Sequence, residues 1–287
     1  MPDATIWVID NNSTDQTSKV AERLGIQVVH VQQQGKGYAV RQAFSMISSK
    51  FETICMLDGD GTYSTKEFKN ACELVLMKNI DMVVGNRIKR EESELSLSTF
   101  RRGHTTGNKI FSFLFSKLFR LEIKDTLSGW RVFSYPFVKS FTEGASGFEI
   151  EMELNTHAML LDVSVINIDV EYRERMQGSH SKLNTYTDGW RILRRMLLMY
   201  RSEKPFLAYG FLSIPWVLLS AYSMEIVISE FLEKQRILHF PTLIGGVGAF
   251  IVGALIGVTG MILEKVRLGR VSLIRSIYNS AKTQTSK

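Results

Sequence analysis

Two aspartates, Asp58 and Asp60, stand one residue apart directly after an apolar run, in the stretch MLDGDGTY. Two carboxylates fixed at the end of a buried strand need a cation, or one of them must take up a proton. Mg²⁺ or Mn²⁺ meets this need when a substrate's phosphates supply further ligands. The spacing also matches the start of an EF-hand loop, but Tyr63 and Lys69 replace that loop's glycine and bidentate glutamate. From these residues alone, a metal–phosphate site and a plain turn both stay open.

Short apolar segments alternate with helical patterns around this pair of aspartates. Strand patterns are present in the segments TIWVID, IQVVHV, TICMLD and DMVVGNR. Helical patterns separate them, and the first of these would be capped by Ser13 or Thr14 and closed by Gly25. Alternation at this spacing predicts an α/β domain with a doubly wound, mostly parallel sheet.

The predicted sheet would bring four charged side chains to one edge. Asp10, Asp58, Asp60 and Arg87 each lie at or just beyond the end of a predicted strand. Open α/β sheets bind their ligands at the carboxyl ends of the strands. We therefore expect the binding site at this edge, with the four side chains in or near it.

Charge and cysteine content narrow the classes of partner. The chain of 287 residues has a formal net charge of +6, which suits anionic partners such as phosphates or a membrane surface. We expect no nucleic-acid partner. Cys55 and Cys72 have neither CxxC spacing nor nearby histidines, so they indicate ordinary buried thiols rather than a disulfide framework or a zinc site.

Two long apolar runs follow the predicted sheet domain, at residues 205–228 and 241–263. Each is close to the roughly 20 residues that cross a bilayer core. The second run carries no charge and is rich in glycine, which would permit copies of the chain to associate as a homo-oligomer. A pair of helices buried in a soluble core is the alternative, although a small domain rarely buries two helices that are apolar all round.

Positive residues flank both runs on the side away from their short connecting loop. They are Arg191, Arg194, Arg195, Arg201, Lys204, Lys265, Arg267 and Arg270. Because positive residues stay on the cytoplasmic side, we expect an integral, multi-pass membrane protein whose N-terminal domain is cytoplasmic. The expected organisation is a domain at 1–189, an amphipathic in-plane helix at 190–204, two spans within 205–264 and a basic cytoplasmic tail at 265–287.

Six motifs occur in an order that points to a known family. They are VIDNNSTDQT, QGKGYAVRQAF, MLDGDGTYS, VVGNR, DTLSGWRVF and YRERMQGSHSKLNTYTDG. Together they resemble family 2 glycosyltransferases, in particular the branch that loads sugars onto polyprenyl phosphates, such as dolichyl-phosphate mannose synthases and bactoprenol glucosyl transferases. The resemblance covers residues 5–191. It implies a GT-A-like fold, a UDP- or GDP-sugar donor, a polyprenyl phosphate acceptor at the lipid bilayer, and Mg²⁺ or Mn²⁺ as cofactor.

The resemblance also implies roles on the donor side. Asp10 would hold the nucleoside, and Asp15 would either add a second contact or cap a helix. Lys36 would supply a cation near the nucleotide. Asp60 would hold the metal on the diphosphate, with Asp58 as the nucleotide-side partner and second metal ligand. The metal would withdraw charge from the leaving nucleoside diphosphate.

The acceptor side is basic in this interpretation. A lipid phosphate would be bound through charge-assisted hydrogen bonds from several cations, namely Arg87, Arg101, Arg102, Arg131, Arg175 and Lys182. Arg102 and Arg175 are the principal candidates for a catalytic contact. Asp125 would orient an acceptor or an arginine, or act as a base, with Glu149 and Glu151 as alternative bases. A phosphate oxygen is already anionic and attacks without a base, whereas a sugar hydroxyl needs one.

One departure from the family qualifies the expected activity. Its members begin with a strand that ends in P-x-x-N-E, and no residue here matches that strand. Either the start of the chain is assigned too late, or the protein is shortened. For the chain as given, we expect the first strand of the sheet to be missing and folding or donor binding to be impaired. The main hypothesis is transfer of a sugar to polyprenyl phosphate by an inverting, metal-dependent hexosyltransferase. The alternatives are a catalytically impaired membrane-bound interaction module, and a family 2 transferase with a glycolipid or polysaccharide acceptor.

Overall fold

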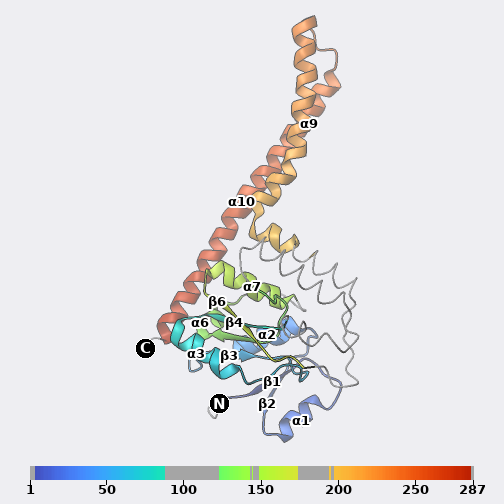
Figure 1. Cartoon of the computed structure of the whole chain (residues 1–287). Helices are drawn as coiled ribbons and strands as arrows, with labels where there is room; N and C mark the ends of the chain where they lie inside the picture. Colours follow the sequence, from blue (N-terminus) through green and yellow to red (C-terminus); the bar gives the residue numbers. More distant parts are fainter. Residues whose placement is uncertain are drawn as a thin grey trace, which may run out of the picture. The chain divides into compact units, whose positions relative to one another are not determined.

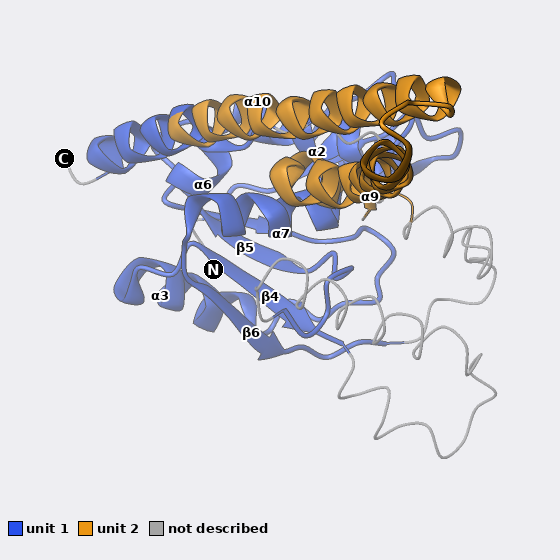
Figure 2. Ribbon diagram, turned by 90° about the horizontal axis from the view of Figure 1, so that it is seen from above, with its two compact units in different colours: residues 1–193, 273–287 blue, residues 194–272 orange. Residues whose placement is uncertain are grey.

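The computed structural model describes residues 4–87, 123–142, 149–173 and 197–285, together with Gly144 and Arg194. The chain forms two compact units (Figure 2). The first consists of residues 1–193 and 273–287, and the second of residues 194–272. The first unit is an α/β domain, and the second contains two long helices (Figure 1). The prediction of an α/β domain followed by two apolar helices is confirmed.

The four strands predicted around the motifs all form. The described strands of the first unit are β1 (Trp7–Asp10), β2 (Gln27–His30), β3 (Thr53–Met56), β4 (Met82–Asn86), β5 (Arg131–Ser134) and β6 (Val165–Asp169). Its described helices are α1 (Thr17–Arg23), α2 (Lys36–Met46), α3 (Phe68–Lys78), α6 (Tyr135–Ser140) and α7 (Ile150–Leu161). The predicted order of strand and helix is therefore retained as far as β4.

The described strands form two sheets, which corrects the prediction of one mostly parallel sheet. β1 pairs with β2 in parallel, and a second sheet has the order β3-β5-β4-β6. β5 runs antiparallel to both β3 and β4, whereas β4 and β6 are parallel. β5 places the apolar Val132 and Phe133 between Arg131 and Ser134, and such a short segment carries no local signal of its direction. The sequence pattern had no means to place it in the middle of the sheet.

Alternate residues of the central strands fill two cores, one on each face of the four-stranded sheet. Met82, Val84 and Phe133 pack with α2, α6 and α7, and Val83 and Val132 pack with α3. Helices thus cover both faces (Figure 2). Burial of each such side chain contributes about 1.5–3 kcal/mol, so the sheet is a firm base for the loops at its carboxyl edge.

The last turns of the second apolar helix belong to the first unit. This helix, α10 (Phe240–Thr285), is continuous, and its residues Ile274 and Tyr278 lie in the first core. Tyr278 Oη donates to Asp81 Oδ1 at 2.8 Å, and Arg275 Nε donates to the carbonyl of Leu160 at 2.9 Å. The predicted basic tail at 265–287 is therefore helical to Thr285. Buried Ile274, Tyr278 and Ala281 repeat at helical spacing, which explains the docking.

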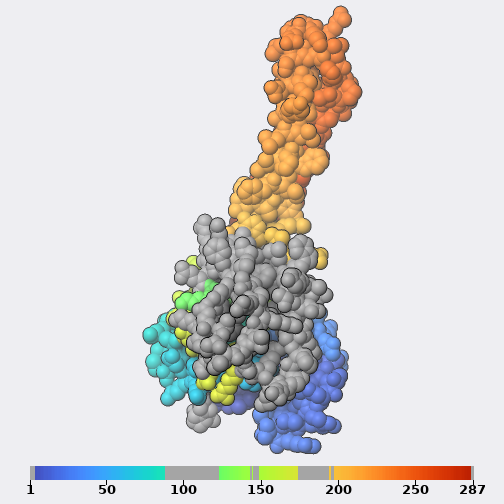
Figure 3. Space-filling model, turned by 45° about the vertical axis from the view of Figure 1, so that its right-hand side comes forward, coloured from blue at the N-terminus to red at the C-terminus, as the bar shows by residue number. Residues whose placement is uncertain are grey.

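The second unit holds α9 (Pro205–Lys234) and most of α10. Both helices are long and apolar enough to cross a membrane, by length and composition. Only 11% and 22% of their most apolar windows are buried, which argues against two core helices of a soluble domain. Their side chains together form the surface of the hairpin, coloured yellow to orange in Figure 3. Of the predicted helix at 190–204, residues 197–203 are described and are helical.

Three glycines, seven residues apart, hold α9 and α10 close together. A Cβ atom on Gly246 or Gly260 would lie 2.8 Å from a side-chain atom of α9, and one on Gly253 would lie 3.2 Å away. These three glycines, which the sequence offered for association between copies, instead contact α9 of the same chain. At the turn, Glu230 Oε2 accepts from the backbone N–H groups of Leu238 and His239, which fixes the start of α10.

Candidate active site

Lys36 stands between two carboxylates at the carboxyl edge of the sheets. Its Nζ lies 2.5 Å from Asp58 Oδ1 and 2.6 Å from Glu151 Oε1. The Lys36 and Asp58 side chains are 18% and 30% exposed, whereas that of Glu151 is 3% exposed. Burial disfavours the charged lysine, but the carboxylates of Glu151 and Asp58 outweigh it and raise the Lys36 pKa above its ordinary value. The lysine is therefore a permanent cation at neutral pH.

The backbone before Lys36 is fixed by a conformation that favours glycine. Gly35 has φ 138° and stands immediately before α2. Its N–H donates to Asn11 Oδ1 at 2.6 Å, and Asn11 Nδ2 donates to the carbonyl of Gln33. The loop after β1 thereby sets where α2 begins and from where the lysine side chain emerges.

Asp58 follows β3 and rests against Gly129. A methyl group on Gly129 would overlap the Asp58 carboxylate, so only glycine leaves room for it there. The Gly129 N–H donates to Tyr63 Oη at 3.2 Å, which ties the loop before β5 to the loop after β3. The glycine of the DTLSGWRVF motif thus serves the aspartate of MLDGDGTY.

Asp60 is held in its own turn by a neighbouring threonine. Its Oδ1 accepts from Thr62 Oγ1 at 2.6 Å and from the Thr62 N–H at 3.2 Å. Gly61 between them has φ 74°, in the left-handed region where glycine meets no steric penalty. The carboxylate is consequently oriented by the backbone that carries it.

Asp58 and Asp60 suit a divalent ion that takes most of its ligands from elsewhere. Within the described part of the chain, no group of three or more His, Cys, Asp or Glu residues could hold a metal by itself. Two carboxylates with diphosphate oxygens and water are a donor set that Mg²⁺ accepts. Asp58 already binds one cation, the ammonium group of Lys36. The residues present therefore fit the predicted Mg²⁺ or Mn²⁺.

Asp10 is buried at the end of β1 and shapes the turn that follows. Its Oδ1 accepts from the Ser13 N–H at 3.1 Å, and its Oδ2 accepts from Ser18 Oγ at 2.8 Å. His30 Nδ1 lies 3.1 Å from Oδ2. The hydrogen bonds from Ser13 outweigh burial and, with those from Ser18 and His30, lower the Asp10 pKa to about 2. The predicted nucleoside contact of this carboxylate would thus have to compete with three partners.

Asp15 accepts hydrogen bonds at the start of the first helix. Its Oδ1 accepts from the Thr17 N–H at 2.9 Å and from Thr17 Oγ1 at 2.5 Å. This agrees with the helix-capping alternative for Asp15. The helix itself begins at Thr17, after Gln16, so the prediction that Ser13 or Thr14 caps it was wrong. The Ser13 N–H instead donates a hydrogen bond to Asp10 Oδ1.

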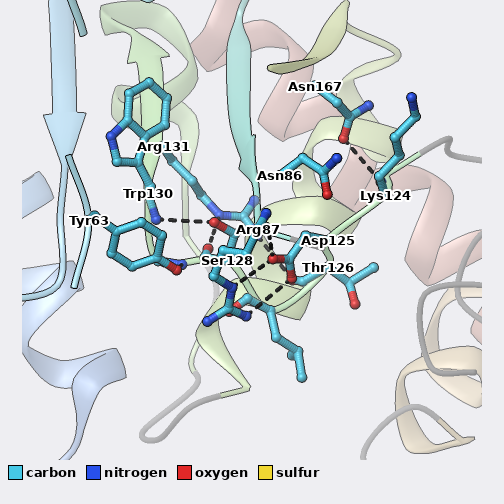
Figure 4. A network of polar contacts seen from close by, with 12 residues as sticks. Tyr63, Asn86, Arg87, Lys124, Asp125, Thr126, Ser128, Trp130, Arg131 and Asn167 are labelled. Atoms are coloured by element: carbon cyan, nitrogen blue, oxygen red, sulfur yellow. Dashed lines mark hydrogen bonds and ion pairs between the residues drawn. The ribbon is translucent and has the colours of Figure 1, made fainter. Parts of the chain in front are cut away.

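Arg87 and Asp125 form a two-pronged ion pair (Figure 4). Arg87 Nε donates to Asp125 Oδ2 at 2.7 Å, and Nη2 donates to Oδ1 at 3.2 Å. The guanidinium lies 5.9 Å and 5.5 Å from the ring centres of Tyr63 and Tyr172. Asp125 is fully buried and both of its oxygens face the arginine. Among the roles predicted for Asp125, this geometry favours orienting an arginine over acting as a base.

Arg131 lies inside the domain rather than on the acceptor side. Its side chain has no exposed surface, and burial lowers its pKa to about 10. Nε donates to the carbonyl of Ser128 at 3.0 Å, and Nη2 donates to the carbonyl of Thr126 at 3.1 Å (Figure 4). Nη1 donates to Asn155 Oδ1 at 2.5 Å. The structure thus gives Arg131 a supporting role for the loop before β5, in place of the predicted phosphate contact.

The remaining acceptor-side cations, Arg101, Arg102, Arg175 and Lys182, lie outside the described residues. Of the others, the structure brings Lys36 to Asp58 and Arg87 to Asp125. Sequence reasoning did not foresee that Glu151 would bind Lys36. The available signal was the run EIEMEL, which starts an otherwise apolar helix with acids, because a buried acid needs a partner.

Comparisons with known proteins show which family this chain resembles. Residues 1–141 match the family described as Glycosyl transferase family 2. An uncharacterized protein of Shigella flexneri is 36% identical over 159 residues, which are 54% of this chain and 96% of that protein. Glycosyltransferase AglJ of Haloferax volcanii is 29% identical over 208 residues, 72% of this chain and 66% of AglJ. A dolichyl-phosphate hexose transferase of the same archaeon is 24% identical over 194 residues, 68% of this chain and 80% of that protein.

An α/β domain with paired aspartates and a lysine at its carboxyl edge is consistent with a glycosyltransferase of GT-A type. The chain belongs to glycosyl transferase family 2.

Proposed function

We propose that the chain transfers a sugar from a UDP- or GDP-sugar to a polyprenyl phosphate, of the undecaprenyl or dolichyl type, at the cytoplasmic face of a membrane. The observation that carries this proposal is the Lys36–Asp58 pair beside Asp60, in a family 2 domain joined to two helices able to cross a bilayer. The similarity to a protein named dolichyl-phosphate hexose transferase supports the choice of acceptor.

The proposed reaction is a single displacement. An oxygen of the lipid phosphate attacks the anomeric carbon of the donor sugar and forms the new C–O bond. The bond from that carbon to the diphosphate breaks on the opposite side, so the anomeric configuration inverts. The nucleoside diphosphate leaves with the bonding electrons, and no proton has to move because the attacking oxygen is already an anion.

The residues of the site divide this work. A bound Mg²⁺ or Mn²⁺ would supply Lewis-acid stabilisation of the leaving diphosphate. Asp58 and Asp60 would hold that ion, and Lys36 would add a positive charge on the same side. Placing such charges before the reaction stabilises the transition state without reorganisation. Asp10 orders the adjoining loop from its buried position.

The acceptor side offers a guanidinium but no exposed base at Asp125. The Arg87 guanidinium is paired with the Asp125 carboxylate, and 21% of the Arg87 side chain is exposed. It would present its remaining donor capacity to an anion, together with Arg101, Arg102, Arg175 and Lys182. A sugar hydroxyl acceptor would need a base, and the carboxylate of Asp125 has no exposed surface. This removes Asp125 as the base that a glycolipid or polysaccharide acceptor would need, which supports a phosphate acceptor.

A donor panel tests the proposal. The full chain, in membrane extract with added polyprenyl phosphate, is given UDP- and GDP-sugars one at a time, and the lipid products are identified by mass. The expected result is one lipid-phosphate sugar whose formation needs a divalent ion. A product on a lipid or polysaccharide hydroxyl, or no product with any donor, would contradict it.

Asp60→Asn separates the enzyme from a membrane-bound interaction module. The amide keeps the hydrogen bonds from Thr62 but loses the charge that would hold the ion. We expect transfer to fall at least about 100-fold with thermal stability little changed. A scaffold would retain its partner binding and show no dependence on Asp60 in any transfer assay.

A further inference from the structure

Lys36 neutralises a carboxylate that a donor-bound metal would use. Its ammonium group is within 2.6 Å of both Asp58 and Glu151, so three charged atoms stand in one short chain. Asp58 is the more exposed end of that chain and Glu151 the buried end. An ion that reaches Asp58 from solvent therefore meets a carboxylate that already has a cation.

We propose that Lys36 neutralises Asp58 before the donor binds and is displaced from Asp58 by the donor's metal–diphosphate. Glu151 is then the positioning residue that keeps Lys36 beside the site. This inference rests on the proposed function, because it assigns a step to the donor site of that reaction.

Glu151 has the placement that such a role requires. It lies in the first turn of α7, and its side chain is 3% exposed. One oxygen, Oε1, accepts from Lys36 at 2.6 Å. The other, Oε2, is buried with no hydrogen-bond partner among the residues that the structure describes. Loss of its one hydrogen-bond partner would leave a buried carboxylate unpaired, which costs free energy. Glu151 therefore binds the lysine strongly, because water cannot replace it.

The lysine can change partners without any movement of backbone. The start of α2 is fixed by the Gly35–Asn11 hydrogen bond, while the lysine side chain itself has four rotatable bonds. A divalent ion on Asp58 would repel the ammonium group at this distance. Glu151 would then retain the ammonium group of Lys36, and the remaining N–H donors of that group would face the incoming diphosphate. The same charge thus stabilises Asp58 before the donor binds and, after displacement, the leaving group.

Binding of Mn²⁺ alone, without donor or acceptor, tests this competition. The purified full chain in detergent is titrated with Mn²⁺, and free Mn²⁺ is measured by its electron paramagnetic resonance signal. Lys36→Met removes the competing charge at similar length, so the Kd for Mn²⁺ should fall at least about threefold. Glu151→Gln leaves Lys36 with Asp58 as its remaining carboxylate partner, so the Kd should rise by a similar factor.

The opposite signs of these two effects separate the proposal from a merely structural role. Glu153→Gln is the matched control, since Glu153 is also buried and lies two residues away on α7; it should leave the Mn²⁺ affinity unchanged. Equal shifts in Lys36→Met and Glu151→Gln, or no shift in Lys36→Met, would overturn the proposal. If Glu151→Gln does not fold, the Lys36→Met result alone decides.

The donor panel and the Mn²⁺ titration fail independently. A chain that forms the lipid-phosphate sugar but binds Mn²⁺ no better after Lys36→Met retains the proposed function and loses this inference. Opposite shifts in Mn²⁺ affinity without any lipid product would support the lysine displacement and contradict the proposed acceptor.

Discussion

Four aspartates near the carboxyl edge show how environment sets the role of one residue type. Asp10 and Asp125 are buried and fully engaged by neighbouring donors. Asp58 and Asp60 are more open, and one of them is paired with a lysine side chain. Carboxylates of the first kind hold the loops in place, and those of the second kind are the ones that an incoming cation can reach.

Gly129→Ala should damage the site while sparing the fold. The new methyl group overlaps the Asp58 carboxylate, which is the free end of a side chain and can rotate away. That rotation breaks its contact with Lys36, so transfer should fall roughly 100-fold with little change in thermal unfolding. The control is Gly59→Ala, whose methyl group meets nothing within 4 Å. Equal activity of the two variants would refute the importance of this contact.

Asp10→Asn should remove an acid-sensitive part of the stability. The Asp10 pKa is lowered to about 2 in the folded chain, against about 3.9 when unfolded. Its stabilisation, on the order of 1–2 kcal/mol, is therefore complete above pH 4 and is lost as the pH falls through 2. Urea unfolding in detergent should show the variant weaker at pH 7 and nearly equal to the parent at pH 2. Asp162→Asn, at an exposed position, should show no such trend.

At the scale of elements, glycine placement decides how the two long helices meet. Gly246, Gly253 and Gly260 recur every seven residues and face α9. Gly257 lies on the same helix and meets nothing within 4 Å. Small residues at a repeated position let two helix backbones approach closely. Here the two helices are α9 and α10 of one hairpin.

Gly260→Val should destabilise the hairpin. Its first added carbon would lie 2.8 Å from Tyr209 Cβ and 3.4 Å from the carbonyl of Pro205, so the helices must separate. A cost of about 1–3 kcal/mol is expected from overpacking, seen as a lower midpoint of thermal unfolding in detergent. Gly257→Val makes the same chemical change in open space and should have a much smaller effect. A similar loss in both variants would mean that helix propensity, not packing, is responsible.

At the scale of the whole molecule, one helix belongs to both compact units. α10 passes from the hairpin into the α/β domain, where Tyr278 and Ile274 join the core. The α/β domain thus contains residues that precede the two apolar segments, 1–193, and residues that follow them, 273–287. Its stability should therefore depend on residues that are distant in sequence from the strand that they support, since Tyr278 bonds to Asp81 just before β4.

Tyr278→Ala tests that dependence. Loss of the ring and of its hydrogen bond should cost about 3 kcal/mol. Hydrogen exchange measured by mass spectrometry should report faster exchange in residues 81–84, relative to the parent chain. Asn279→Ala, at the exposed neighbouring position, should leave that exchange unchanged. Unaltered protection in Tyr278→Ala would show that the domain holds β4 without the helix.

The sequence by itself determined the local elements, the order of the motifs, the family and the two apolar helices. Periodicity and strand-end charges are local properties, and they are sufficient to identify β1 to β4 and to predict that Asp58, Asp60 and Arg87 follow strand ends. Only the tertiary structure decided the direction of β5, the burial of Arg131 and the pairing of Lys36 with Glu151, 115 residues apart. Such contacts depend on how distant segments return to one sheet, and no spacing along the chain encodes which partner a buried charge will meet.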